Sequence, residues 1–391
     1  MSKVVKRIND SNYDEVLNLS EYAFKYTLTE QQRAEQKIEM EKQTIFGIFE
    51  NDQLSAKLHL LPLELFLGKD VVPFGGVAAV ATWPEHRRKG HVEALIKAGL
   101  EEMRDRNQTL SMLAPFSISF YRKFGWELTH YVHKYYFNPV DIAKVNVDGR
   151  CVRVSFEHAN DVLQSLYEQM AQKYSLVMKR EFWWWEKRVL STDDHVIIYY
   201  DRMGKATGYL TSKVKNGVLQ VNEFVFLTGD ACKGLLEWIR NHDSMTDQVE
   251  LNVQPQDDIV FYFHNPKIKM CRESYFMTRI VDFERFILSY PFFRTDKPFK
   301  VSILLQDDYA EWNSGGWTLF IQDNRVEKIT KNMDPDSDLS ITTNIQTLTA
   351  LLFNSESVER LHTFDHLQIE GDIEVAKKLI QPLPPALLDF F

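Results

Sequence analysis

The chain has 391 residues, enough for two or three domains of roughly 100 to 200 residues each. Hydrophobic residues make up 44% and charged residues 26%, which are ordinary globular values and exclude extended disorder. The net charge of −9 argues against nucleic acid as the main partner, because phosphate binding needs a concentrated basic face.

Cysteine usage and hydropathy give a second set of exclusions. Cys151, Cys232 and Cys271 lie far apart without a C-x-x-C spacing, so neither a disulfide framework nor a zinc site is indicated. The N-terminus has no apolar signal region, and no run of about 18 uncharged apolar residues occurs. We therefore expect a cytoplasmic protein that is neither secreted nor embedded in a membrane.

The first third of the chain mixes helices and strands. Apolar residues recur at helical spacing after the capping sequence NDSNYDE, whereas alternation and an Asn51–Asp52 turn indicate a hairpin. The predicted elements are helices within 12–42, three strands within 44–83, a helix over 90–107, a strand over 110–115, a helical turn around Tyr121 and a strand pair ending near residue 139.

The second region repeats this order. Helices are predicted at 162–175 and 180–189, then a hairpin plus a further strand within 195–227, then a helix at 230–242. A proline-bearing hinge at 289–298 introduces a third region, with strands at 299–307 and 316–324, helices at 344–354 and 372–382, and an apolar tail. The run of three tryptophans in FWWWEKR is interpreted as core and interface packing, since adjacent helical residues point in different directions.

A basic junction at residues 77–96, VAAVATWPEHRRKGHVEALI, is the most informative stretch. A buried strand ends in basic residues and opens directly into a helix, whose first N–H groups have no intrahelical partner and favour an anion. Gly90 allows close backbone approach, and Arg87 and Arg88 add charge. The sequence therefore predicts a phosphate-binding site here.

This junction resembles the R/Q-x-x-G-x-G/A signature of GNAT N-acetyltransferases, with Arg87, Gly90 and Val92 at the three positions. Val92 departs from the usual small last residue. The stretch APFSISFYRKFGWELTH resembles a second GNAT segment through Tyr121, Phe124 and Gly125.

The whole layout resembles the Eis-type (enhanced intracellular survival) acetyltransferases. The resemblance implies an α+β fold with a catalytic GNAT domain at 1–147, a degenerate GNAT domain at 148–288, and a sterol-carrier-protein-like domain at 289–391. It also implies a homo-oligomer, a hexamer, that acetylates amines of small polycationic molecules such as aminoglycosides with acetyl-CoA.

The resemblance assigns roles to individual residues. The terminal carboxylate of Phe391, at the end of LLDFF, is the implied catalytic base, because an amine must lose a proton before it attacks a thioester. Tyr121 matches the acid that protonates the departing thiolate. The residues expected to bind acetyl-CoA are Val80, Ala81, Thr82, Arg87, Arg88, Lys89, Gly90, His91, Val92, Glu93, Phe116 and Ser117.

Other interpretations remain open. In the second region, LTGDACKGLLEW replaces the arginine pair with Asp230, which indicates a copy without an anion site. His86 and His91 lack a nearby third ligand in the sequence, so no metal is expected. Two alternative functions are a tandem-GNAT aminoacyl transferase, which the absence of a lysine-rich helix disfavours, and a non-enzyme that binds an apolar ligand in its third domain.

Overall fold

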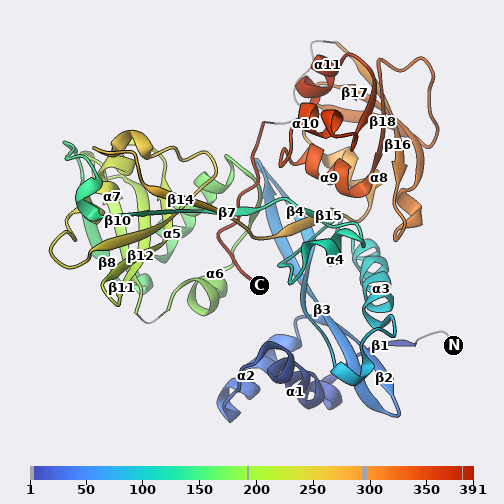
Figure 1. The fold of residues 1–391 in the computed structure, drawn as a ribbon, viewed down its shortest axis with the longest axis horizontal. Helices are drawn as coiled ribbons and strands as arrows, with labels where there is room; N and C mark the ends of the chain where they lie inside the picture. Colours follow the sequence, from blue (N-terminus) through green and yellow to red (C-terminus); the bar gives the residue numbers. More distant parts are fainter. Residues whose placement is uncertain (1–3, 192, 293–296, 381) are drawn as a thin grey trace.

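The computed structural model describes residues 4–191, 193–292, 297–380 and 382–391. Three lobes follow one another in the chain, and the C-terminal segment returns from the third lobe to lie between the other two (Figure 1). Within the described residues, no helix has both the length and the hydropathy that spanning a bilayer requires.

The first lobe is built around a mixed sheet with strand order β1-β2-β3-β4-β5-β15-β6, and β9 pairs with β3. Its helix α3 presents Leu95, Ile96 and Leu100 to the core, as the predicted periodicity requires. Its elements are β1 (Val5–Arg7), α1 (Tyr13–Phe24), α2 (Glu30–Met40), β2 (Thr44–Glu50), β3 (Gln53–Leu67), β4 (Asp70–Thr82), α3 (His91–Asp105), β5 (Leu110–Leu113), α4 (Ile118–Arg122) and β6 (Glu127–Leu128).

The second lobe has a sheet with order β14-β7-β13-β12-β11-β10-β8. Trp184 and Trp185 are fully buried, which confirms that the tryptophan run contributes to the core. Its elements are β7 (Tyr131–Phe137), β8 (Arg150–Val154), α5 (Phe156–Ala171), α6 (Phe182–Trp184), a π-helical turn (Trp185–Val189), β10 (His195–Tyr200), β11 (Ala206–Lys215), β12 (Val218–Phe226), α7 (Gly229–Arg240), β13 (Gln248–Val253) and β14 (Lys269–Ser274). Within this part of the chain, β9 (Ser175–Met178) and β15 (Met277–Ile280) belong to the first sheet, and α8 (Phe283–Ser289) follows β15.

The two lobes exchange strands, which the sequence did not indicate. We expected residues 131–139 to complete the first lobe, but β7 pairs with β13 and β14 in the second sheet. In return, β15 pairs with β5 and β6 in the first sheet. The first two lobes are therefore interlocked, and a boundary drawn at residue 147 cuts across this exchange.

The third lobe has a sheet with order β18-β17-β16-β19-β20. Its elements are β16 (Phe299–Gln306), β17 (Gly315–Gln322), β18 (Arg325–Thr330), β19 (Leu339–Asn344), α9 (Ile345–Leu352), α10 (Val358–Thr363), β20 (Gln368–Gly371) and α11 (Ile373–Leu379). Of the hinge predicted at 289–298, residues 293–296 lie outside the described residues. A buried ion pair between Arg279 Nη2 and Asp307 Oδ2, 2.7 Å apart, connects this lobe to β15.

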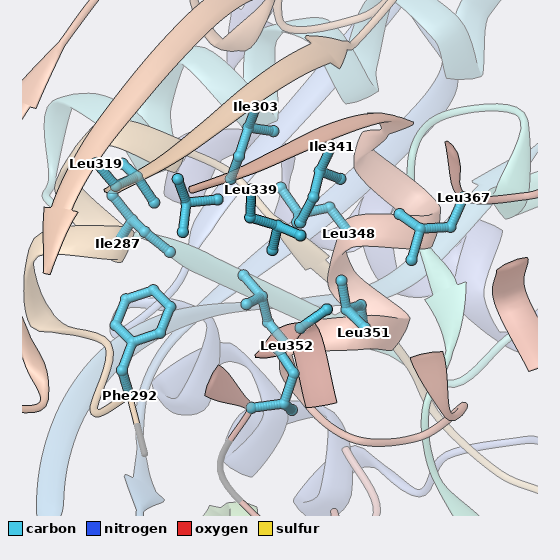
Figure 2. A pocket seen from close by; sticks show the side chains of 13 residues that line it. Ile287, Phe292, Ile303, Leu319, Leu339, Ile341, Leu348, Leu351, Leu352 and Leu367 are labelled. Atoms are coloured by element: carbon cyan, nitrogen blue, oxygen red, sulfur yellow. The ribbon is translucent and has the colours of Figure 1, made fainter. Parts of the chain in front are cut away.

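The interior of the third lobe bears on the apolar-ligand alternative. Leucine and isoleucine side chains from β16, β17, β19 and α9 point toward one another with Phe292 (Figure 2). They enclose a cavity of about 20 Å³, room for a single water molecule rather than a lipid. In this conformation the region is hydrophobic core, and it does not favour that alternative.

Candidate active site

The candidate site begins where β4 and β5 separate. The parallel pairing between them covers only Phe74 to Gly76 on β4, opposite Leu110 to Met112 on β5. Beyond Gly76, β4 continues to Thr82 and pairs only with β3 among the described strands. The strand edge from Val77 onward is therefore available to an extended ligand, which can add to it through backbone hydrogen bonds.

A bulge bends this open part of β4. The register with β3 shifts between Lys57 and His59, and Ala79 has a positive φ of 49°. Past the bulge come Val80, Ala81 and Thr82, the residues predicted to hold the acetyl and pantetheine groups. The Thr82 hydroxyl is buried without a hydrogen-bond partner among the described residues, which suits a polar ligand at this position.

The basic loop leads from β4 into α3. Gly90 is the N-cap of α3 with φ 74°, a left-handed conformation that favours glycine, and its position offers no side-chain cap to the helix. Arg88 is also left-handed at φ 62°, and both Arg87 and Arg88 are exposed. The loop thus combines uncapped helix N–H groups with two exposed guanidinium groups, a combination that suits a pyrophosphate. Val92 is partly buried against the core, which accommodates its larger side chain.

Glu50 organises the other basic residues of this loop. Its carboxylate lies 2.8 Å from Lys89 Nζ, 3.0 Å from His86 Nδ1 and 2.9 Å from His91 Nε2. The Lys89 hydrogen bond is the main reason why the pKa of Glu50 falls to about 2. Glu50 is also the third potential metal ligand that the sequence did not reveal beside His86 and His91. The Lys89 ammonium competes with a metal cation for this carboxylate, so we interpret the cluster as a clamp on the loop.

Tyr121 lies in α4, just beyond the end of β5. Its ring meets Phe116 and Phe120 edge-on, with centroids 5.5 and 5.2 Å away, and its side chain is buried. Burial raises the pKa of Tyr121 well above its usual value, so the phenol keeps its proton at neutral pH. Ser117 caps α4 by accepting a hydrogen bond from the Phe120 N–H, and Phe116 is 75% exposed at the mouth of the separated strands.

The last residue of the chain reaches the point where β4 and β5 separate. The Phe391 ring lies 4.9 Å from the Phe276 ring and 5.8 Å from the Phe74 ring, measured between centroids. A Cβ atom added to Gly76 would lie only 2.8 Å from Phe391 Cε2. The terminal residue is therefore seated on the last β4 residue that pairs with β5, at the start of the open strand.

Comparisons with known proteins identify the domains. Residues 4–129 match the family described as acetyltransferase (GNAT) domain, and residues 176–280 match a second family with that description. Residues 283–388 match the sterol carrier protein domain. The chain is a tandem-GNAT acyltransferase. The predicted α+β class, with two GNAT domains and a sterol-carrier-like third domain, is confirmed.

Solved structures match this acyltransferase over its whole length. A probable N-acyltransferase from Enterococcus faecalis V583 shares 28% identity with a TM-score of 0.90, and each chain covers 100% of the other. A GCN5-related N-acetyltransferase from Anabaena variabilis shares 21% identity with a TM-score of 0.87, again with 100% coverage of both chains. Eis1 from Mycobacterium abscessus has the same fold at 18% identity and a TM-score of 0.82, over 99% of this chain and 100% of that one. Comparison with curated protein sequences finds no match.

Sequence reasoning located the basic loop of the tandem-GNAT acyltransferase but missed residues that act over long separations. Glu50 and Gly76 gave no local signal, because their importance depends on strand pairing. Asp389 did offer one, since it is the single charge in the apolar tail LLDFF, and a buried carboxylate needs partners. Those partners come from the second GNAT domain.

Proposed function

We propose that this chain is an Eis-type N-acetyltransferase, which transfers the acetyl group of acetyl-CoA to an amine of a small polycationic acceptor such as an aminoglycoside. The observation that carries the proposal is the Phe391 ring against Gly76, where the acyl donor's strand edge begins. This contact of the terminal residue supports a base at the chain terminus near the proposed thioester position.

Binding of the donor divides between two elements. Backbone groups of Val80 to Thr82 hold the acetyl and pantetheine portion, and a backbone N–H there stabilises the oxyanion of the tetrahedral intermediate. Residues 87–93 hold the pyrophosphate at the start of α3. In this role Lys89 and His91 contribute their backbone, since their side chains face Glu50.

The chemical step then needs one base and one acid. The Phe391 carboxylate accepts a proton from the acceptor's ammonium group, which frees the nitrogen lone pair to form a bond to the thioester carbon. The nitrogen loses its second proton to solvent as the amide forms. The tetrahedral intermediate collapses by breaking the C–S bond, and the electron pair leaves with sulfur. Tyr121 donates its phenolic proton to that thiolate, and proton exchange with solvent restores both groups. The products are the acetylated amine and free CoA.

An amine screen tests this function. The protein is incubated with acetyl-CoA and single amines, among them kanamycin, spermidine, lysine and peptides, and released thiol is measured. Thiol release that depends on a polycationic acceptor is expected. Absence of release with every amine, although CoA stabilises the protein, would contradict the proposal.

A thermal-shift assay with CoA distinguishes a CoA-dependent enzyme from a protein that only binds apolar ligands. A ligand at about 100 times its Kd stabilises the folded state by roughly 2.7 kcal/mol, which is visible as a higher Tm. A protein that only binds apolar ligands gives no such shift. The hexameric state and the cytoplasmic location implied by the resemblance belong to the same proposal, and light scattering after size-exclusion chromatography measures the former.

A further inference from the structure

The C-terminal tail is held by a buried carboxylate two residues before its end. Asp389 is fully buried, and its Oδ1 accepts hydrogen bonds from Arg180 Nε at 2.9 Å and Trp184 Nε1 at 2.8 Å. Its Oδ2 lies 3.0 Å from the Tyr167 hydroxyl, whose single proton it shares with the Met178 carbonyl, 2.6 Å away. All three donors belong to the second GNAT domain. Burying a charge is costly unless hydrogen bonds satisfy it, so this set of donors indicates that the tail is bound at a specific site.

Arg180 forms the centre of this site. Its guanidinium also pairs with Glu223 on β12 and stacks over the rings of Tyr167, 4.0 Å away, and Trp185, 4.3 Å away. Two carboxylates therefore share one buried cation. Neutralising Asp389 would leave Arg180 and Glu223 as a balanced pair, so the site tolerates loss of the tail's charge without an unpaired ion.

The tail backbone is also fixed before Asp389 and at its carbonyl. The Ser175 N–H donates to the Pro384 carbonyl at 3.0 Å, and the Ala386 N–H donates to the Ser175 carbonyl at 3.1 Å. The Tyr275 hydroxyl donates to the Asp389 carbonyl at 2.8 Å. From Asp389 the chain extends by two residues, a reach of roughly 7 Å, to the Phe391 ring on Gly76.

Through Arg180, the tail's binding site is connected to the second domain's counterpart of the open strand. Parallel pairing of β12 with β13 ends at Val221, just as β4 separates from β5 beyond Gly76. Glu223 lies two residues further along β12 and helps to bind the tail through Arg180. At the start of α7, Thr228 caps the helix with its own side chain, so the anion-binding features of α3 are replaced.

We propose that the second GNAT domain is a receptor for the chain's own C-terminal tail, in which Arg180, Trp184 and Tyr167 hold Asp389 and thereby position the Phe391 carboxylate in the first domain. Asp389 is a positioning residue in this scheme. The kinetic consequence rests on the proposed acetyl-transfer function, whereas the docking itself does not.

The test follows the tail and the reaction separately. Phe391 is replaced by 4-fluorophenylalanine, whose ¹⁹F resonance reports the environment between the Phe74 and Phe276 rings. Asp389→Asn is expected to shift and broaden this resonance toward that of a free tail. With kanamycin as acceptor it is expected to lower kcat roughly tenfold or more, with the KM for acetyl-CoA unchanged. Asp365→Asn, the same change at an exposed residue, serves as the control and leaves both measurements unchanged.

The outcomes test two claims, that the second GNAT domain binds the tail and that the Phe391 carboxylate is the base. An unchanged ¹⁹F resonance in folded Asp389→Asn would overturn the receptor role. A displaced resonance with unchanged kcat would support the receptor role and instead remove Phe391 as the base. Should Asp389→Asn fail to fold, Tyr167→Phe removes one donor without altering charge and is expected to displace the resonance in the same direction.

Discussion

The contact between Gly76 and the last residue permits a sharp perturbation. Alanine at position 76 would bring its Cβ to 2.8 Å from Phe391 Cε2 and 3.1 Å from Leu63 Cδ1, whereas ordinary contacts begin at 3.4 Å. Gly76 does not adopt a left-handed conformation, so the backbone tolerates alanine. The Phe391 ring must therefore move by about 0.6 Å. Because misplacement of a catalytic group by about 1 Å can lower a rate about 100-fold, we expect kcat to fall roughly tenfold, equivalent to about 1.4 kcal/mol.

The assay is steady-state acetyl transfer to kanamycin with thiol detection, and the matched control is Gly99→Ala in α3. A Cβ at Gly99 would lie 3.7 Å from Leu58, an ordinary contact, so this variant is expected to retain full activity. Equal kcat values for the Gly76→Ala variant, the Gly99→Ala variant and the natural protein would refute the idea that the position of Phe391 controls the reaction.

Three further predictions address the acid, the donor site and a buried lysine. Tyr121→Phe removes the proton donor and is expected to lower kcat about 100-fold with the KM for acetyl-CoA unchanged, whereas unaltered turnover would exclude Tyr121 from the mechanism. Arg87→Ala is expected to raise the KM for acetyl-CoA about tenfold, while Arg106→Ala at the far end of α3 leaves it unchanged; equal values would place the pyrophosphate elsewhere. Lys57 is fully buried, and desolvation lowers its pKa from 10.5 to about 7, a penalty of about 5 kcal/mol below pH 7. The unfolded chain binds more protons than the folded one between pH 7 and 10.5, so the free energy of unfolding rises with pH in this window. In denaturation experiments, the free energy of unfolding of Lys57→Met is expected to rise by about 3 to 4 kcal/mol less than that of the natural protein. An equal pH dependence in the two proteins would contradict the burial of the charge.

Much of the fold could be predicted because short sequence patterns determine many of its helices and strands. The apolar face of α3, the alternation in β2 to β4 and the order of elements in both GNAT domains follow from period and turn chemistry. The basic loop was visible because a helix start, a glycine and two arginines are adjacent in sequence.

The strand exchange could not be predicted, because a strand pattern does not specify its partner. The sequence YVHKYYF identifies β7 as a strand, yet its pairing with β13 and β14 is decided by tertiary contacts more than 100 residues away. For the same reason, the sequence did not indicate the contacts of Glu50 with the basic loop or the partners of Asp389. A carboxylate and a guanidinium separated by 209 residues become neighbours only after the third domain returns the tail to the first two.

The most direct test of the central claim changes only the last functional group of the chain. Ligation of a synthetic C-terminal segment yields the protein with an α-carboxamide in place of the Phe391 α-carboxylate, and the same ligation with the natural carboxylate is the control. The carboxamide keeps the ring but cannot accept the amine proton, so we predict a kcat at least about 100-fold lower, with undiminished stabilisation by CoA. A kcat within twofold of the ligated control would contradict the assignment of the terminal carboxylate as the catalytic base.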